Sequence, residues 1–526
     1  MKKNISALLI SLLISSSLIS CTEAFNDEDS SSSNGDILSI KINPGQEFQT
    51  IRNFGASDAW STQFVGKNYP LDKRNKIADL LFSDDFDTNG NPIGIGLGLW
   101  RFNIGAGSIA QGNQSNIVDE WRRAECFLTP NGYNWAAHEG QRWFVQAAKD
   151  RGVNQFVGFS NSPPVVMTSN GKANSSGGNA ANISASNHNN FADFLANVIE
   201  NYKNLYGVEF NYISPFNEPQ YDWLNGQEGS PWLNSEISNI TTLLSQKLIQ
   251  KNLSTKIQIA EAAKLNYLYE TSDKPGRANQ LQDFLNPNSQ NYIGNLTNLD
   301  AVISGHSYFT TFNTTTLLSN RSSLLNNIRA TNPNLEFWMT EYSLLEDNTE
   351  IKGNGRDLGI NPALYMSRVI HADLTVANAS SWQWWLAVSP YDYKDGLVYV
   401  DNNKNDGQVY ESKLLWGLGN YSKFIKEGYK RIGVSRSDNR SIEQSINGIL
   451  ISAYKSNSDG KQVVVITNQL QSTVPIKMTV TGKNTFNAKI YQTSALAADN
   501  LTFKGNATQN QTVNIPPRSI VTFVIE

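Results

Sequence analysis

Two glutamates each follow an apolar run of the chain, and together they could perform acid–base chemistry. Glu218 follows the run Phe210–Phe216 within an Asn-Glu-Pro triplet, and Glu341 follows the run Leu335–Thr340. Either one alone could be a rim charge or a helix cap. Together they supply a protonated carboxyl and a carboxylate, which cleavage of a glycosidic bond with retention requires. We therefore expect Glu218 and Glu341 to share the roles of acid/base and nucleophile.

Residues 51–426 have the pattern of a (β/α)8 TIM barrel. Apolar β-type runs alternate with stretches whose apolar residues recur every three or four positions, as in helices that cover a parallel sheet. Eight strands are predicted, at Asn53–Ser57, Gly98–Ile104, Gln155–Ser160, Asn211–Phe216, Lys256–Ala260, Ala301–His306, Glu336–Glu341 and Ser380–Trp385. Predicted helices include Arg74–Phe82, Gly140–Asp150, Phe191–Tyr206, Ser235–Gln250 and Pro362–Ala377. A doubly wound open sheet is the alternative, but the first strand has no Gly-rich phosphate turn after it.

A barrel of this kind explains how the two glutamates can meet. Catalytic groups of such barrels come from the carboxyl ends of the strands and the loops that follow. Glu218 follows the fourth predicted strand and Glu341 closes the seventh, so both side chains can reach the barrel mouth. We expect a carboxyl separation of roughly 5 Å, short enough for direct attack. Repulsion from ionised Glu341 should raise the pKa of Glu218 and keep it protonated.

The last hundred residues follow a different pattern. From 427 to 526, short β-type runs are separated by Ser, Asn, Asp and Gly turns, which predicts a β-sandwich beside the barrel. The segment 37–50 also has a β-type run, Ile37–Ile42, and is predicted to add a strand to this sandwich. The predicted fold class is therefore α/β, a TIM barrel with a side β-sandwich domain.

The first residues are typical of an export signal. Lys2 and Lys3 precede an apolar run that is too short for a comfortable membrane span, so residues 1–20 are predicted to be a signal peptide. The segment ending at Cys21 resembles a bacterial lipobox, in which the cysteine is lipidated, and residues 21–36 form an acidic, Ser-rich tether. We expect anchoring to the outer membrane, at the cell surface, through this lipid alone. Cys126, the only other cysteine, is expected to fill the core.

Composition and motif spacing argue against several other classes of protein. A formal net charge of −4 gives no broad basic surface, so nucleic acid is not an expected partner. No His/Cys/Asp group has metal-ligand spacing, since the histidines are scattered, and neither a metal nor a cofactor is expected. The sequence contains no Gly-x-Ser-x-Gly motif of the kind found at the nucleophile of esterases, which argues against an esterase. The expected partner is a polysaccharide substrate.

Further side chains at predicted strand ends are candidates for substrate binding. Arg101, near the end of the second strand, could hold Glu341 ionised or bind sugar hydroxyls; a rim ion pair is the alternative. On the eighth strand Trp382 and Trp384 share one face and Trp385 the other, so one face should floor the sugar site while the other packs. The remaining candidates are Asp58, Trp60, His306, Tyr308 and Tyr221; a core position for His306 is nearly as plausible.

Several ordered motifs resemble glycoside hydrolase family 30 of clan A over nearly the whole chain from Ile37. They are Asn53–Trp60, Leu99–Gly107, Phe159–Pro164, Pro215–Gln220 and Thr340–Tyr342. The resemblance implies a retaining mechanism in which Glu218 is the acid/base, Glu341 the nucleophile and Asn217 a ligand of the sugar 2-hydroxyl. The sequence is most similar to the branch with endo-β-1,6-galactanases. Activity on β-1,6-glucan or xylan, exo-acting galactosidase or fucosidase activity, and a non-catalytic surface glycan-binding lipoprotein remain alternatives.

Overall fold

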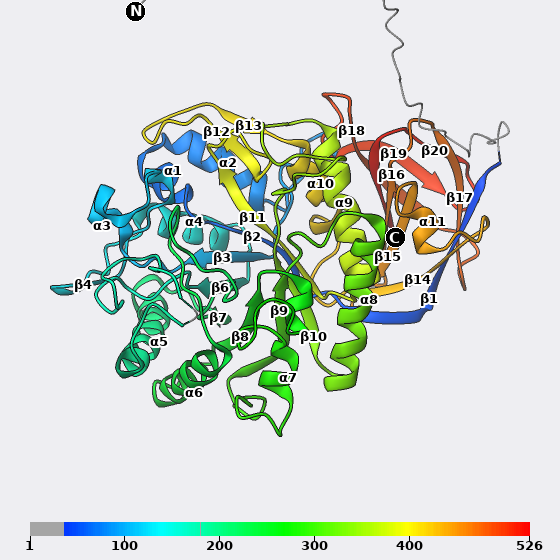
Figure 1. Ribbon diagram of the computed structural model, residues 1–526. Coiled ribbons are helices and arrows are strands. Elements are labelled where there is room, and N and C mark those ends of the chain that lie inside the picture. Colours follow the sequence, from blue (N-terminus) through cyan, green and yellow to red (C-terminus); the bar gives the residue numbers. More distant parts are fainter. Residues whose placement is uncertain (1–35, 179) are drawn as a thin grey trace, which may run out of the picture. The chain divides into compact units, whose positions relative to one another are not determined.

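Eight parallel strands close into a barrel in the computed structural model, which describes residues 36–178 and 180–526. They are β2 (Asn53–Ser57), β3 (Leu99–Asn103), β6 (Gln155–Phe159), β7 (Tyr212–Ser214), β8 (Lys256–Ala262), β9 (Leu299–His306), β10 (Glu336–Glu341) and β11 (Ser381–Ser389). The ring closes because β11 pairs in parallel with both β10 and β2. The predicted barrel is thus confirmed, each of its strands lying where the apolar runs predicted it (Figure 1).

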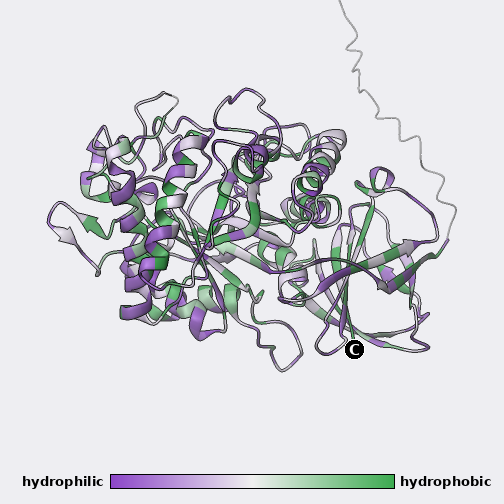
Figure 2. Cartoon of the chain, turned by 90° about the horizontal axis from the view of Figure 1, so that it is seen from below, coloured by the Kyte–Doolittle hydropathy of each residue, from purple (hydrophilic) through white to green (hydrophobic). Residues whose placement is uncertain are grey.

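Helices connect successive barrel strands and bury one side against them. The longer ones are α2 (Leu71–Phe82), α4 (Glu139–Asp150), α5 (His188–Tyr206), α6 (Asn234–Gln250), α8 (Thr314–Thr331), α9 (Ile360–Thr375) and α10 (Lys413–Ser422). Shorter ones are α1 (Thr62–Asn68), α3 (Ser108–Gln111) and α7 (Gln280–Leu285). Both α10 and α11 (Ile442–Ser445) follow the last barrel strand. Figure 2 shows hydrophilic and hydrophobic residues alternating along helices, as expected where one side meets a sheet and the other meets water. By contrast, α9 and α10 are buried on nearly all sides.

Small additions extend the barrel sheet and its loops. Strand β12 (Gly396–Val400) pairs in parallel with β11, and β13 (Val409–Glu411) pairs antiparallel with β12. A short hairpin of β4 (Leu128–Thr129) and β5 (Gly132–Tyr133) lies in the connection between β3 and α4. These additions leave the order of the eight barrel strands unchanged.

A second sheet combines strands from the two ends of the described chain. It comprises β1 (Leu38–Thr50), β14 (Lys430–Arg436), β15 (Ile449–Lys455), β16 (Gln462–Asn468), β17 (Val474–Val480), β18 (Asn487–Ser494), β19 (Thr502–Thr508), β20 (Val513–Ile515) and β21 (Ser519–Ile525). Strand β1 pairs antiparallel with β14 and parallel with β17, and all the other pairs are antiparallel. The N-terminal strand therefore lies within a sheet otherwise built from the C-terminal segment.

Alternating residues of this side sheet enter two different apolar cores. On β16, Val464 and Ile466 belong to a cluster drawn from all nine strands, so the sheet must curl around that cluster. Val463 and Val465, which point to the opposite face, belong instead to the main core together with residues of α9 and α10. The predicted side β-domain is thus confirmed, and it shares a core with the barrel helices.

The predicted signal peptide and Cys21, with all but the last residue of the tether, lie outside the described residues. Within the part of the chain that the structure describes, no helix has both the length and the apolar character needed to cross a bilayer. Cys126 is buried, with a free thiol.

Candidate active site

The barrel brings the two predicted catalytic glutamates close together. Glu341 is the last residue of β10, and Glu218 lies in the loop that follows β7. Side-chain oxygens of Glu218 and Glu341 and a ring nitrogen of His306 all lie within 4.8 Å of one another. Both carboxyls are almost fully buried, at 6% and 4% exposure. This separation suits direct attack by one carboxylate while the other donates a proton.

The backbone at Glu218 is held in an uncommon conformation. Its φ of +43° lies in the left-handed region that side-chain-bearing residues rarely adopt. Two backbone hydrogen bonds stabilise it: Glu218 N–H donates to the Glu261 carbonyl at 2.9 Å, and Tyr221 N–H donates to the Glu218 carbonyl at 3.0 Å. Strained backbone of this kind often occurs where a functional side chain must point in one direction.

Glu341 accepts hydrogen bonds from two buried donors. Arg101, on β3, donates from Nη1 to Glu341 Oε2 at 2.5 Å, and the Tyr308 hydroxyl donates to Glu341 Oε1 at 3.2 Å. Arg101 also donates from Nη2 to Asn217 Oδ1 at 3.0 Å, and its guanidinium lies 3.7 Å from the Phe159 ring centroid. The two hydrogen bonds, one of them from a cation, fix the position of both oxygens of this carboxyl group.

Glu218 has the environment of a proton donor. Its Oε1 lies 2.9 Å from His306 Nδ1. Burial is the largest cause of its raised pKa, the negative charge of Glu341 adds to it, and His306 and Arg101 oppose it. From the sequence, repulsion from Glu341 was the one expected cause of this raised pKa. The structure adds desolvation as the larger effect, since a buried carboxyl favours its neutral form.

A third buried carboxylate, Glu261 at the end of β8, completes the site and was not anticipated from the sequence. Its Oε2 accepts from His306 Nε2 at 3.0 Å, Thr340 Oγ1 at 2.9 Å and Arg101 Nη2 at 3.3 Å. Burial alone would raise the pKa of Glu261, but the His306 hydrogen bond and the Arg101 charge lower it overall. Glu261 directly follows the fifth predicted strand, the same signal that singled out Glu218 and Glu341.

His306 lies between the three carboxyls and carries a positive charge at neutral pH. Burial lowers its pKa, but Glu341, Glu218 and Glu261 outweigh that effect and raise it to about 10. With Glu218 protonated, the cations Arg101 and His306 balance the anions Glu341 and Glu261. The site is therefore electrically neutral when Glu218 holds its proton, which favours that state in a buried environment.

Glu218, His306 and Glu341 are also a conceivable metal-binding group by spacing. A metal ligand needs an unprotonated imidazole nitrogen. Both ring nitrogens of His306 already face carboxylates, and its pKa of about 10 keeps both protonated near neutral pH. The geometry therefore favours a proton-transfer site over a metal centre.

Two substrate-binding candidates that follow β2, Asp58 and Trp60, are both buried beside the site. Asp58 is fully buried and accepts from Asn103 N–H at 2.8 Å, while its Oδ2 has no hydrogen-bond partner; burial raises its pKa to about 8. Trp60 packs edge-on against Trp385, with ring centroids 5.3 Å apart. Trp385 in turn lies 6.0 Å from the Arg101 guanidinium. Trp60 and Trp385 thus form an aromatic wall next to Arg101.

Trp382 and Trp384, candidates for substrate binding from the sequence, donate their indole hydrogen bonds to residues outside the carboxyl cluster. The Trp382 indole donates to Asp373 Oδ2, on α9, at 2.9 Å. The Trp384 indole donates to the Asp395 carbonyl at 2.6 Å. Both side chains are completely buried in the main core. Trp385, on the opposite face of β11, is the tryptophan that lies beside Arg101. The sequence showed that the two faces differ but could not indicate which one meets the site.

Tyr221 lies close to the predicted acid/base. It is partly buried, and its ring packs edge-on against Trp223 at 5.5 Å between centroids. The Trp223 indole donates to the Glu218 carbonyl at 3.1 Å, so this aromatic pair borders the Glu218 loop. A parallel barrel with paired glutamates, one after β7 and one at the end of β10, is the arrangement expected of a barrel-type glycoside hydrolase.

Comparisons with known proteins give the family. The chain belongs to O-glycosyl hydrolase family 30, whose model matches residues 37–399. An endo-β-1,6-galactanase from Hypocrea rufa is 27% identical over 236 residues, covering 41% of this chain and 47% of that enzyme. The chain thus spans less than half of this curated relative. The family resemblance inferred from the ordered motifs is confirmed.

Solved structures agree with the fold. A conserved exported protein from Bacteroides fragilis has a TM-score of 0.87 and 34% identity, covering 92% of this chain and all of that one. The catalytic domain of a family 30 xylanase C from Talaromyces cellulolyticus has a TM-score of 0.65 at 22% identity, over 93% of this chain and all of that one. The second likeness shows the shared fold alone.

Proposed function

We propose that this glycoside hydrolase cleaves a β-linked polysaccharide with retention, using Glu218 as acid/base and Glu341 as nucleophile. The observation that carries the proposal is the pair of buried carboxyls within 4.8 Å, one facing Arg101 and Tyr308 and the other facing His306. Retaining enzymes hold their carboxyls about 5–5.5 Å apart, whereas inverting enzymes leave room for a water.

In the first step, Glu341 Oε1 or Oε2 attacks the anomeric carbon while the bond to the leaving oxygen breaks. Glu218 gives its proton to that oxygen. Because His306 Nδ1 faces Glu218 Oε1, the transferable proton belongs on Oε2. The carboxylate left behind is stabilised by the charged imidazole, which lowers the cost of losing that proton in a buried site.

In the second step, water replaces the leaving group. Ionised Glu218 takes a proton from the water, whose oxygen attacks the anomeric carbon and releases Glu341. The released Glu341 carboxylate again accepts hydrogen bonds from Arg101 and Tyr308, as it does in the free enzyme. Asn217, held by Arg101, is the proposed ligand of the sugar 2-hydroxyl.

Azide rescue tests the two roles. Glu341→Ala should abolish formation of the glycosyl-enzyme, and azide should then yield an inverted glycosyl azide. Glu218→Ala should retain activity on aryl glycosides whose leaving groups need no proton, and azide should yield the retained product. Loss of the acid should cost about 10²–10⁴-fold on an ordinary glycoside.

Two results would contradict the assignment in different ways. Near-normal turnover of the polysaccharide by both variants would remove both glutamates from catalysis. Rescue in the opposite stereochemical sense would exchange their roles. A wild-type protein that binds glycan but cleaves none would instead support the non-catalytic alternative.

The first substrate to test is β-1,6-galactan, with endo action. The galactanase from Hypocrea rufa supports this choice, although at 27% identity over less than half its length. Purified protein should be incubated with β-1,6-galactan, β-1,6-glucan and xylan, followed by product sizing. Short oligosaccharides from galactan would support endo action on it, and release of single sugars would point to an exo enzyme.

We also propose that Cys21 carries a lipid that anchors the protein at the cell surface. Support comes from the lipobox-like segment before it and from the exported relative in Bacteroides fragilis. Cys21→Ala should move the protein out of the membrane fraction and abolish incorporation of labelled fatty acid. Retention of the variant in membranes would contradict the proposal.

A further inference from the structure

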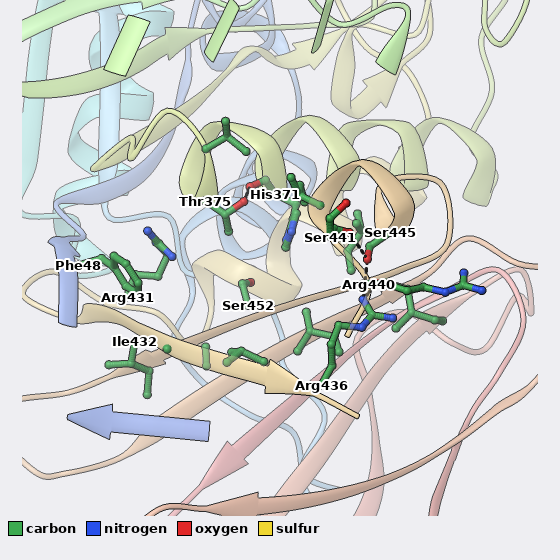
Figure 3. Close-up of a pocket in the computed structure, with 18 of the residues that line it drawn as sticks. Phe48, His371, Thr375, Arg431, Ile432, Arg436, Arg440, Ser441, Ser445 and Ser452 are labelled. Atoms are coloured by element: carbon green, nitrogen blue, oxygen red, sulfur yellow. Dashed lines mark hydrogen bonds between the residues drawn. The ribbon is translucent and has the colours of Figure 1, made fainter. Parts of the chain in front are cut away.

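A cavity of about 500 Å³ lies between α9 and the side sheet, away from the catalytic glutamates. Its walls come from β1, α9, β14, α11 and β15, and none of its lining residues belongs to the candidate active site. The volume falls within the ~300–1,000 Å³ typical of small-molecule sites. Figure 3 shows arginine and histidine side chains directed into this space from both the helix and the sheet.

Arg431 of β14 is a buried cation with neutral partners. Its Nε donates to Gln49 Oε1 at 2.9 Å and its Nη2 donates to Asn378 Oδ1 at 2.7 Å. The guanidinium lies 3.8 Å from the Phe48 ring centroid. Burial, unrelieved by any carboxylate, lowers the pKa of Arg431 to about 10. Buried charges are normally paired, so the remaining Nη1 is a donor suited to an anion.

His371 of α9 faces the same cavity and has unused hydrogen-bonding capacity. Its side chain is 5% exposed, and no described residue forms a hydrogen bond with its ring nitrogens. Burial and the charges of Arg431 and Arg436 lower its pKa to about 3, so the ring is neutral. A neutral imidazole can donate to one ligand oxygen and accept from a hydroxyl.

The cavity as a whole is positively charged. Among the described residues that line it, three are arginines and none is acidic. Arg436 pairs with Asp438 at 2.6 Å, and exposed Arg440 lies 3.8 Å from the same carboxylate. Asp438, which does not line the cavity, is therefore the carboxylate that faces both Arg436 and Arg440, and the charge of Arg431 stays uncompensated. An anionic ligand would restore the balance.

The remaining walls indicate what kind of anion fits. Val376, Ile442 and Leu450 supply apolar surface, and Thr375, Ser441 and Ser452 supply hydroxyls. A bare inorganic anion would leave much of this volume and the apolar wall unused. A sugar acid offers a carboxylate, several hydroxyls and an apolar C–H face in one molecule. We propose that this cavity is an accessory binding site for a sugar acid, with the carboxylate on Arg431 and a hydroxyl on His371.

Calorimetric titration of the purified protein with glucuronate tests the site directly. We expect saturable binding at one site, weakened about 10-fold or more by Arg431→Gln, because a charge-assisted hydrogen bond contributes about 1.5–3 kcal/mol. His371→Phe keeps the shape of the ring but removes both nitrogens, and it should weaken binding several-fold. Both variants should first be shown to melt cooperatively, and His371→Phe serves if Arg431→Gln does not fold.

Three controls make the result specific. Arg142→Gln removes another arginine that bonds backbone carbonyls and stacks on a ring, 4.8 Å from the Tyr206 centroid, and should leave binding unchanged. Glu341→Gln should also bind glucuronate normally, which separates this site from the active site and from the outcome of the hydrolase tests. Glucose should bind far more weakly than glucuronate.

The proposal would be overturned by any of three outcomes. The first is that wild-type protein shows no saturation up to about 10 mM glucuronate, because a Kd above this concentration corresponds to less than ~3 kcal/mol of binding free energy. The second is that Arg431→Gln and wild type bind glucuronate equally well. The third is that inorganic phosphate binds while glucuronate does not, which would make the cavity a simple anion site.

Discussion

His306 determines where the proton of the active site resides. A histidine between three carboxyls could in principle give its proton to any of them. With a pKa of about 10, however, His306 stays protonated near neutral pH. The consequence falls on Glu218, whose Oε1 faces the charged ring and whose proton is therefore confined to Oε2. Glu261 Oε2 accepts hydrogen bonds from His306, Thr340 and Arg101, so its negative charge stabilises the charged imidazole.

Glu261→Gln tests this positioning role. The variant loses a negative charge that raises the pKa of His306, so that pKa should fall. A His306 that holds its charge less strongly lowers the pKa of Glu218 less, so the pKa of Glu218 should rise. The alkaline limb of the pH profile of kcat/KM should move upward while kcat near pH 7 falls about 10–100-fold, the equivalent of one charged hydrogen bond.

Thr340→Val is the matched control, because it removes a neutral donor to the same Oε2 and leaves every charge in place. Its pH profile should coincide with that of wild type. If Glu261→Gln also leaves the profile unmoved, Glu261 has only a structural role, whatever happens to kcat.

Single residues could be predicted from the sequence where strand position alone decides their location. Glu341 ends β10, Glu218 lies in the loop after β7 and Arg101 lies on β3, and the structure brings the three together as their strand positions predicted. Glu261 carries the same mark, yet its role depends on His306 and Arg101, contacts that only the closed barrel creates. Trp382 and Trp385 differ by which face of β11 they occupy, which depends on how the strand is rotated in the barrel.

At the level of elements, α1 and α4 meet through two glycines. A Cβ added at Gly66 would lie 2.1 Å from the Gly140 carbonyl oxygen, and one added at Gly140 would lie 1.9 Å from the Gln63 carbonyl oxygen. The Gln63 side chain then accepts from Gly140 N–H at 3.2 Å. The two helix backbones are therefore in direct contact beside the segment that follows β2.

Gly140→Ala should destabilise the protein because backbone carbonyls cannot move aside as side chains can. We expect a loss of about 1–3 kcal/mol in the free energy of unfolding, typical of overpacking, measured as a fall in the melting temperature. Gly98→Ala is the control, since an added Cβ there meets no atom within 4 Å. Equal melting temperatures for the two variants would show that the helices can separate without cost.

Periodicity explains why the elements themselves were predictable. Apolar residues at three- and four-residue spacing predicted α4, α5 and α6, whose buried faces they form, and apolar runs predicted the barrel strands. The side sheet is harder, since pairing between β1 and β17 joins residues more than four hundred positions apart in the sequence. Local pattern carries no information on such partners, so the sequence indicated strands there without their order.

At the scale of the whole molecule, the barrel and the side sheet share apolar surface. Tyr454, Val463, Val465 and Ile520 of the sheet lie in the same core cluster as residues of α9 and α10. The Ser367 hydroxyl of α9 bonds both Tyr421 of α10, at 2.9 Å, and Thr467 of β16, at 2.6 Å. The outer surface of these two helices is thus an interior surface of the protein.

Truncation after Glu427 should therefore make the barrel insoluble. It would expose the apolar sides of α9 and α10 and leave β1 without β14 and β17, and exposed apolar patches and unpaired edges both promote aggregation. In the full chain, Ile520→Asp should reproduce the defect by placing a charge in the shared core, whereas Asn487→Asp, at an exposed position of β18, should leave solubility and melting temperature unchanged. Expression yield in the soluble fraction and activity per soluble protein measure the effect. A soluble barrel ending at Glu427 with full activity would mean that the side sheet is an independent domain and that the shared core contributes little to the stability of the catalytic part.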